Sequence, residues 1–98
     1  MAFIQIVEFR SSKIDEMRSL EDEWSERAGT DTSARRTLLC ADRDDPGHYF
    51  TVVFFDSYES AMQNSEHPLT REFAGRMSSL ADGPASFRNL DVLDDRTW

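Results

Sequence analysis

Residues 49–55, Tyr-Phe-Thr-Val-Val-Phe-Phe, are apolar at nearly every position. A strand with one exposed face alternates apolar and polar residues, whereas a strand covered on both faces is a near-continuous run of β-branched and aromatic residues. The two faces of such a strand would carry Phe50, Val52 and Phe54 on one side, and Tyr49, Thr51, Val53 and Phe55 on the other. The segment therefore predicts a central strand that needs a cover on each side.

Three other segments show strand patterns. Residues 2–10 alternate with a period of two, and Gln5 is the one polar residue in an otherwise apolar row. Residues 35–41 form a short strand-like run, and residues 86–94 carry apolar side chains on both sides. We expect all three to join the same sheet as 49–55.

Apolar residues at helical spacing predict helices between these strands. Residues 12–28 repeat apolar side chains every three or four positions, a serine can cap the start, and Glu21 belongs to an acidic face exposed to solvent. A short helix of residues 57–64 begins at Ser57, and Pro68 opens a further helix that runs to about residue 80.

The order strand, helix, strand, strand, helix, strand is that of the ferredoxin-like α+β fold. We therefore predict a single domain of residues 1–98, with a four-stranded antiparallel sheet and its helices on one face. These helices leave the second apolar face of 49–55 uncovered, and the chain has no other element to cover it. We expect two copies to pack sheet against sheet as a homodimeric α+β barrel.

Composition narrows the range of partners and compartments. The net charge is −8 and the pI about 4.6, so the chain lacks the clustered basic residues that nucleic-acid binding requires. It has neither an apolar run that could span a membrane nor a signal-peptide pattern at its start. Cys40 is the only cysteine, which excludes an internal disulfide and predicts a small buried side chain in a reducing compartment. We expect a cytoplasmic protein that binds neither nucleic acid nor membranes.

The spacing of aspartates and histidines does not favour a metal site. Residues 42–47, Asp-Arg-Asp-Asp-Pro-Gly, contain three aspartates, but Pro46 stands where an EF-hand loop has a ligand. This segment predicts a hairpin turn instead. His48 and His67 are far apart and lack the short spacings of transition-metal ligands. We therefore predict no metal site and an exposed His48.

Four stretches together carry a resemblance to a known family. They are residues 3–9 (Phe-Ile-Gln-Ile-Val-Glu-Phe), residues 49–61, the pair His67 and Pro68, and residues 83–87 (Gly-Pro-Ala-Ser-Phe). The most recognisable part is the third strand followed by an aromatic residue, Glu, Ser and Ala. With these stretches the chain resembles, over nearly its whole length, the antibiotic-biosynthesis-monooxygenase-like members of the dimeric α+β barrel superfamily.

That superfamily includes cofactor-free oxygenases that convert phenols or hydroquinones to quinones, haem-degrading monooxygenases, and proteins with no established substrate. The resemblance places Tyr58 where the oxygenases often have tryptophan, and Gln5 nearest to the strand asparagine of the haem type. Phe54 corresponds to the strand asparagine of the quinone-forming type. The iron-binding histidine of the haem type falls near Phe73, which cannot bind iron, so the resemblance implies a protein without haem or another cofactor.

A cofactor-free oxygenase has to bind a phenolic ring, stabilise its anion and exclude water. The candidate catalytic residues are Gln5 and Tyr58 as hydrogen-bond donors and His67 as a base near neutral pH. Simpler roles stay open for them: a hydrogen bond across the sheet for Gln5, a surface hydroxyl for Tyr58, and a helix cap for His67. The candidate ligand-binding residues are Trp24, Thr51, Phe54 and Phe73.

Two hypotheses about function follow from this pattern. In the first, a cavity between sheet and helices binds a small aromatic or polyketide-like molecule and oxidises it with molecular oxygen. In the second, the chain is a non-catalytic small-molecule-binding or structural homodimer of the same fold. The first requires that Gln5, Tyr58 and His67 converge on one open pocket, and the second that Phe54 and Phe73 fill that space.

Overall fold

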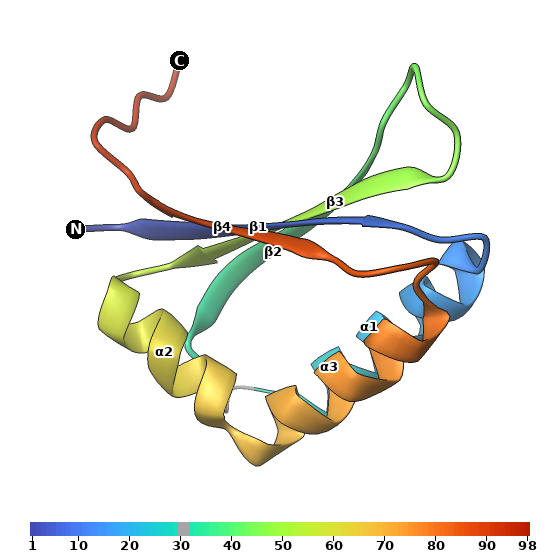
Figure 1. Cartoon of the computed structure of the whole chain (residues 1–98). Helices are drawn as coiled ribbons and strands as arrows, with labels where there is room; N and C mark the ends of the chain where they lie inside the picture. The colour runs from blue at the N-terminus through green and yellow to red at the C-terminus, as the bar shows by residue number, and fades with distance from the viewer. Residues whose placement is uncertain (30–31) are drawn as a thin grey trace.

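The computed structural model describes residues 1–29 and 32–98. The elements in these ranges are β1 (Phe3–Arg10), α1 (Ile14–Ala28), β2 (Ala34–Ala41), β3 (His48–Phe55), α2 (Tyr58–Glu66), α3 (Pro68–Leu80) and β4 (Ser86–Asp91). The strands form one antiparallel sheet in the order β2-β3-β1-β4. Figure 1 shows the sheet with α1, α2 and α3 all below it. This arrangement confirms the predicted ferredoxin-like α+β fold, with the second helical region divided into α2 and α3.

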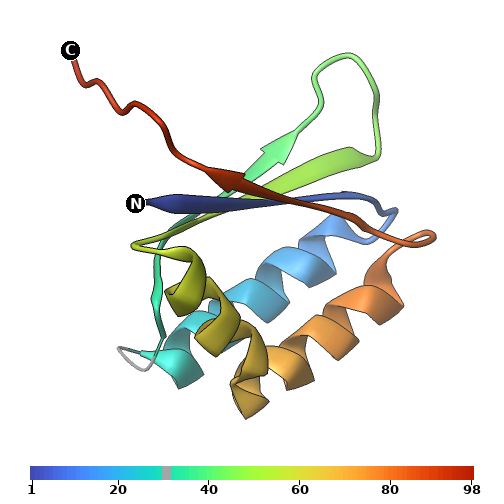
Figure 2. The same ribbon diagram turned by 60° about the vertical axis from the view of Figure 1, so that its left-hand side comes forward.

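Strand β3 is the central strand that the sequence predicts, with β1 on one side and β2 on the other. Its residues Thr51 and Phe55 are buried and face the helices. Val52 and Phe54, which alternate with them, point to the opposite face and are only half-buried. The two views agree that all three helices lie on the same side of the sheet (Figures 1 and 2). One face of an apolar strand is thus covered within the chain and the other is not.

Helix α1 begins without the serine cap that the sequence predicts. Its first residue is Ile14, and the flanking Lys13 makes no side-chain cap hydrogen bond. The buried Ser11 has another role: its hydroxyl accepts a hydrogen bond from the Lys13 N–H and donates one to the Leu80 carbonyl, at 2.9 and 2.8 Å. The serine therefore joins the start of α1 to the end of α3.

The junctions before α2 and between α2 and α3 follow the sequence signals. The hydroxyl of Ser57 accepts a hydrogen bond from the Ser60 N–H at 3.1 Å and so caps α2. At the break between the helices, Nδ1 of His67 accepts a hydrogen bond from the Leu69 N–H at 3.1 Å. Pro68 takes the first position of α3, where its missing N–H costs no helical hydrogen bond. The helix-capping role that the sequence left open for His67 is confirmed.

The buried side chains pack densely at one end of the sheet. Phe3, Phe55 and Ala61 form a cluster where α2 lies against β1 and β3. Helices α1 and α3 pack on one another and bury Met17 and Phe73 among other residues. The sheet face below α1 and α3 is the place where space for a ligand can exist.

The edges of the sheet differ from prediction in two respects. β4 ends at Asp91, because the chain leaves the sheet after the Val92 N–H donates to the Ala2 carbonyl at 2.9 Å. Cys40 is exposed, which contradicts the predicted burial, because it lies opposite Phe50 on the sheet face that no helix covers. No helix in the described part of the chain is both long and apolar enough to cross a membrane.

Candidate functional site

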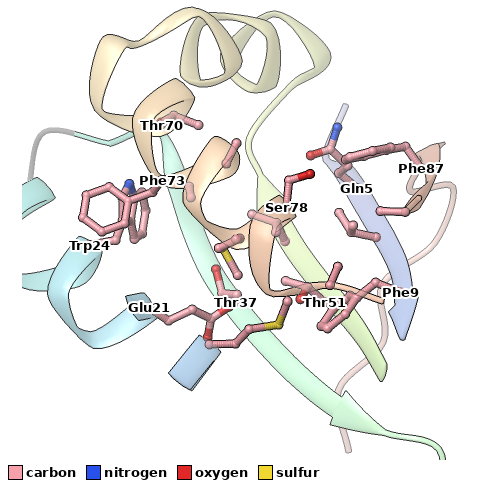
Figure 3. A pocket seen from close by; sticks show the side chains of 18 of the residues that line it. Gln5, Phe9, Glu21, Trp24, Thr37, Thr51, Thr70, Phe73, Ser78 and Phe87 are labelled. Atoms are coloured by element: carbon pink, nitrogen blue, oxygen red, sulfur yellow. The ribbon is translucent and has the colours of Figure 1, made fainter. Parts of the chain in front are cut away.

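A cavity of about 520 Å³ lies between the sheet and the helices α1 and α3. Its walls come from the helix-facing sides of β1, β2 and β3, from one side of α1 and α3, and from the segment 81–87 that leads into β4. Figure 3 looks into this cavity, with the helices on one side and the strands on the other. The volume is that of pockets that hold small organic ligands.

Aromatic side chains contribute several faces to this cavity. Trp24 of α1 and Phe73 of α3 lie on the helix side (Figure 3), and Phe73 is only 3% exposed. The guanidinium groups of Arg27 and Arg76 lie 5.3 and 4.8 Å from the centre of the Phe73 ring, within the range of cation–π contacts. The sheet side adds Phe9, Phe55 and Phe87. Such walls suit a flat apolar ligand, which can pack on the ring faces and edges.

A small number of polar side chains interrupt the apolar wall. Gln5 on β1, Thr37 on β2 and Thr51 on β3 all line the cavity. Nε2 of Gln5 donates a hydrogen bond to Oδ1 of Asn89 at 3.2 Å, which is the bond across the sheet that the sequence left open. In the part of the chain that the structure describes, the hydroxyls of Thr37 and Thr51 make no side-chain hydrogen bond. These groups can therefore orient a ligand through its polar atoms.

Glu21 is the acidic residue of this cavity, and sequence reasoning missed it. The side chain is half-buried and lines the cavity (Figure 3), so its predicted place on a solvated face is wrong. Burial raises the pKa of Glu21 above its ordinary value, and the neighbouring charge of Asp22 raises it further. The signal was present in the spacing: Glu21 lies four residues after Met17 and three before Trp24, so it shares their side of α1.

Three of the predicted site residues lie away from this cavity. Tyr58 is 49% exposed, and its ring packs edge-on against Phe3 with ring centres 5.4 Å apart. His67 caps α3, and Phe54 lies on the opposite face of the sheet with the Arg36 guanidinium 5.5 Å from its ring centre. None of these three lines the cavity, whereas Gln5, Trp24, Thr51 and Phe73 do. The three predicted polar groups therefore do not converge, and the cavity adds no support to catalytic roles for Tyr58 and His67.

A separate polar cluster surrounds His48 on the uncovered side of the sheet. The imidazole is 15% exposed, with Nδ1 3.0 Å from the Asp42 carboxylate and Nε2 2.6 Å from the Glu8 carboxylate. The predicted exposure of His48 is wrong, because the hairpin folds Asp42 back onto the ring. The hydrogen bonds to Asp42 and Glu8 raise the pKa of His48, and hydrogen bonds from the Asp44 N–H and His48 lower the pKa of Asp42.

The geometry around His48 is that of a hydrogen-bonded turn. Asp42, Asp45 and His48 offer potential metal-ligand atoms within 4.8 Å of one another. Both ring nitrogens of His48 already contact carboxylates, and an ion pair with Arg10 lowers the pKa of Asp45. The Asp44 N–H donates to the Asp42 carboxylate at 3.0 Å, and Gly47 has a positive φ of 85°. These contacts confirm the hairpin turn that the sequence predicts for residues 42–47.

No family model matches the sequence, and a comparison with curated proteins found no match. Solved structures match the fold over nearly the whole chain. SnoaB from Streptomyces nogalater, described as a cofactor-independent oxygenase, is 12% identical with a TM-score of 0.80, over 96% of this chain and 95% of that one. Rv0793 from Mycobacterium tuberculosis is 16% identical with a TM-score of 0.78, over 99% and 100% of the two chains.

A third structure, described as an antibiotic biosynthesis monooxygenase, is 15% identical with a TM-score of 0.74, over 96% of this chain and all of that one. At these identities the likeness extends to the fold and not to the residues of a site. It agrees with the resemblance carried by the opening strand, the central strand and its following helix. The chain thus has the fold of the antibiotic-biosynthesis-monooxygenase-like proteins.

Proposed function

We propose that this protein binds a small hydroxylated aromatic molecule in the cavity between the sheet and α1 and α3, and oxidises it with molecular oxygen without a bound cofactor. The observation that supports this most is the cavity itself, which has a ligand-sized volume, aromatic walls and a few polar groups. The fold of SnoaB, described as a cofactor-independent oxygenase, agrees with it. The resemblance places the iron-binding histidine of the haem type near Phe73. This residue cannot bind iron and is part of the cavity wall.

The proposed reaction uses the electrons of the substrate. A phenol and one O₂ molecule give a quinone and one water molecule: one oxygen atom bonds to the ring carbon, and the other leaves as water. The protein has to hold the ring, favour its anion and keep bulk water away. Trp24 and Phe73 would contact the ring, while Gln5 and Thr51 would hold its oxygen substituents.

The test measures binding and oxygen consumption in the same protein. Naphthols and hydroquinones should raise the melting temperature in a saturable way, because a ligand that binds only the folded state stabilises it by mass action. A cavity-filling variant, Ala74→Trp, should lose the shift, because Ala74 lines the cavity from α3. Oxygen uptake above the rate of the spontaneous reaction, and above that of this variant, would support catalysis.

The two outcomes that would contradict the proposal are separate. If no hydroxylated aromatic compound shifts the melting temperature, the proposed ligand class is wrong. A shift without oxygen uptake would remove the oxygenase activity and favour the second candidate function, a non-catalytic binding protein.

A homodimer is the second part of the proposal, and the uncovered face of the sheet supports it. In the observed register Ile4, Ile6, Val52 and Phe54 lie together on this face, with Leu38 beside Val52. Leu38 is 36% exposed in the single chain. A continuous apolar sheet face of this kind is typical of a surface that another chain covers. We place the second copy there, sheet against sheet.

Sedimentation velocity tests the dimer. Val52→Asp puts a charge at the centre of the uncovered face and should convert the dimer to a monomer. Leu93→Asp, on the tail and 87% exposed, is the matched control and should leave the dimer intact. A wild-type protein that is monomeric at all concentrations would contradict this part of the proposal.

A further inference from the structure

Glu21 lies on the boundary between two hollows of the molecule. On one side is the cavity described above, and on the other a second hollow of about 430 Å³ between α1 and the edge of the sheet. The second hollow is lined by Ile14, Arg18, Glu21, Asp22, Leu39, Ala41 and Tyr49. Glu21 is the one described residue that lines both, so its carboxyl group can reach a molecule in the main cavity while the second hollow connects it toward solvent.

The Glu21 carboxyl group is half-buried without compensation. Among residues 1–29 and 32–98, no group hydrogen-bonds or ion-pairs with it. Met17 and Trp24 flank it on the same side of α1, Thr37 of β2 lines the cavity beside it (Figure 3), and Arg18 and Asp22 border the second hollow with it. Partial burial of an unpaired carboxylate opposes folding, because the group loses hydration and receives no hydrogen bond in return. A ligand with a hydrogen-bond donor would supply the bond that the protein does not.

We propose that Glu21 determines the specificity of the cavity by accepting a hydrogen bond from a hydroxyl group on an aromatic ring that packs against Trp24 and Phe73. This inference rests on the proposed ligand class and adds the residue that recognises it. The arrangement of the three side chains around one side of the cavity is visible in Figure 3. An aromatic molecule without a hydroxyl group would leave the carboxylate unpaired and would bind more weakly.

The same contact has a chemical consequence for the bound hydroxyl group. Burial raises the pKa of Glu21, which makes its carboxylate a better proton acceptor than an ordinary one. When the proton moves, the ligand O–H bond breaks, an O–H bond forms on Glu21, and the electron pair stays on the ligand oxygen. The product is the electron-rich aromatic anion that a reaction with O₂ requires.

The experiment compares two ligands and three variants. Naphthol carries the hydroxyl group, and fluoronaphthalene has nearly the same shape without it. Dissociation constants for both are measured with wild type, Glu21→Leu, Glu21→Gln and Glu26→Gln. Glu26 is an exposed residue of the same helix and serves as the matched control for a lost charge.

We expect Glu21→Leu to weaken naphthol binding about tenfold or more, which is the scale of one hydrogen bond to a charged group. Fluoronaphthalene should bind Glu21→Leu at least as tightly as wild type, because no carboxylate is then left unpaired, and Glu26→Gln should change the affinity for neither ligand. Equal naphthol affinity in wild type and Glu21→Leu would overturn the role of Glu21. Binding of neither ligand to wild type would overturn the proposed function itself, so the two failures are distinct.

A second readout separates recognition by Glu21 from a structural effect of its replacement. A hydrogen bond from the ligand stabilises the charged carboxylate, so the pKa of Glu21 should fall when naphthol binds. Carboxyl chemical shifts followed by NMR across a pH titration report this pKa with and without ligand. A pKa that stays the same with saturating naphthol would show that the hydroxyl group does not reach Glu21.

Discussion

Replacing Phe73 with alanine tests whether the cavity wall also holds the fold together. Phe73 is 3% exposed, lines the cavity and packs beneath the guanidinium groups of Arg27 and Arg76. Phe87 lines the same cavity from β4 but is 64% exposed. The two residues are chemically identical and differ in burial, so Phe87→Ala is the matched control.

The difference in burial sets the expected magnitudes. Truncation of a buried phenylalanine costs about 3–5 kcal/mol, and we expect the lower end because Phe73 already borders open space into which neighbours can move. Full burial of a phenylalanine side chain contributes about 1.5–3 kcal/mol, so a residue that is 64% exposed should contribute about a third of that, or about 0.5–1 kcal/mol. Phe73→Ala should therefore lower the melting temperature by about 12–24 °C and Phe87→Ala by about 2–8 °C.

Urea unfolding followed by tryptophan fluorescence measures the loss of unfolding free energy in Phe73→Ala and in Phe87→Ala. The chain has two tryptophans, Trp24 at the cavity and the fully exposed Trp98, so Trp98→Phe in every variant leaves Trp24 as the single reporter. All proteins are compared at one concentration, because association changes apparent stability. Equal losses in Phe73→Ala and Phe87→Ala, or a loss below about 1 kcal/mol in Phe73→Ala, would refute this account of the packing.

Three further predictions concern charges and caps. His48→Gln should reduce stability most below pH 6.5 and progressively less as pH rises through the raised pKa of His48. The reason is that the hydrogen bonds to Asp42 and Glu8 favour the charged imidazole. Urea midpoints of wild type and variant that differ equally at all pH values would contradict this. Ser57→Ala should cost about 1 kcal/mol by removing the cap of α2, and no change in the urea midpoint would show that the cap is unimportant. Glu21→Leu should stabilise the protein by about 1 kcal/mol near neutral pH by removing an unpaired half-buried carboxylate. The gain should shrink as pH falls through the raised pKa of Glu21 and be smallest below pH 4.5, where the carboxyl group is protonated in the folded and the unfolded chain. A loss of stability at neutral pH would contradict the prediction.

The sequence predicted the fold because local signals and the overall fold agree. The doubly apolar run 49–55 indicated the central strand of a sheet, and the strand and helix order then left one common topology. The cap of α2 at Ser57 and the start of α3 at Pro68 were predicted correctly, because these signals act within a few residues. The serine cap expected for α1 is absent, and the Ser11 hydroxyl instead donates to the Leu80 carbonyl, far away in the sequence.

The candidate site was predicted only in part, because local periodicity sets the direction of a side chain but contacts between distant segments form the cavity. Gln5, Trp24, Thr51 and Phe73 face the cavity because strand alternation and helical spacing set their direction. Phe54 follows the same alternation and was nevertheless chosen as a lining residue, although it lies on the face opposite Thr51 and Phe55. That choice ignored the period of two on which the strand assignment itself rested.

The environments of Glu21 and His48 could not be predicted from their residue types. A glutamate in an acidic helix suggests a solvated face, and only the packing of α1 against the sheet shows that position 21 borders the cavity. A histidine beside a turn suggests exposure, and only the register of β1 and β3 shows that Glu8 lies within reach of its ring. Both depend on contacts between segments distant in sequence.

The most direct test of the ligand-binding cavity uses the four methionines as reporters. Met17 and Met77 line the cavity, whereas Met62 packs near the Phe3 cluster and Met1 is 77% exposed. Isotope-labelled methionine methyl groups give one NMR signal each, and naphthol is added to saturation. We expect the signals of Met17 and Met77 to shift along a common binding curve while those of Met1 and Met62 stay in place. Shifts confined to Met1 or Met62, or no shift in any signal, would contradict a ligand site between the sheet and the helices.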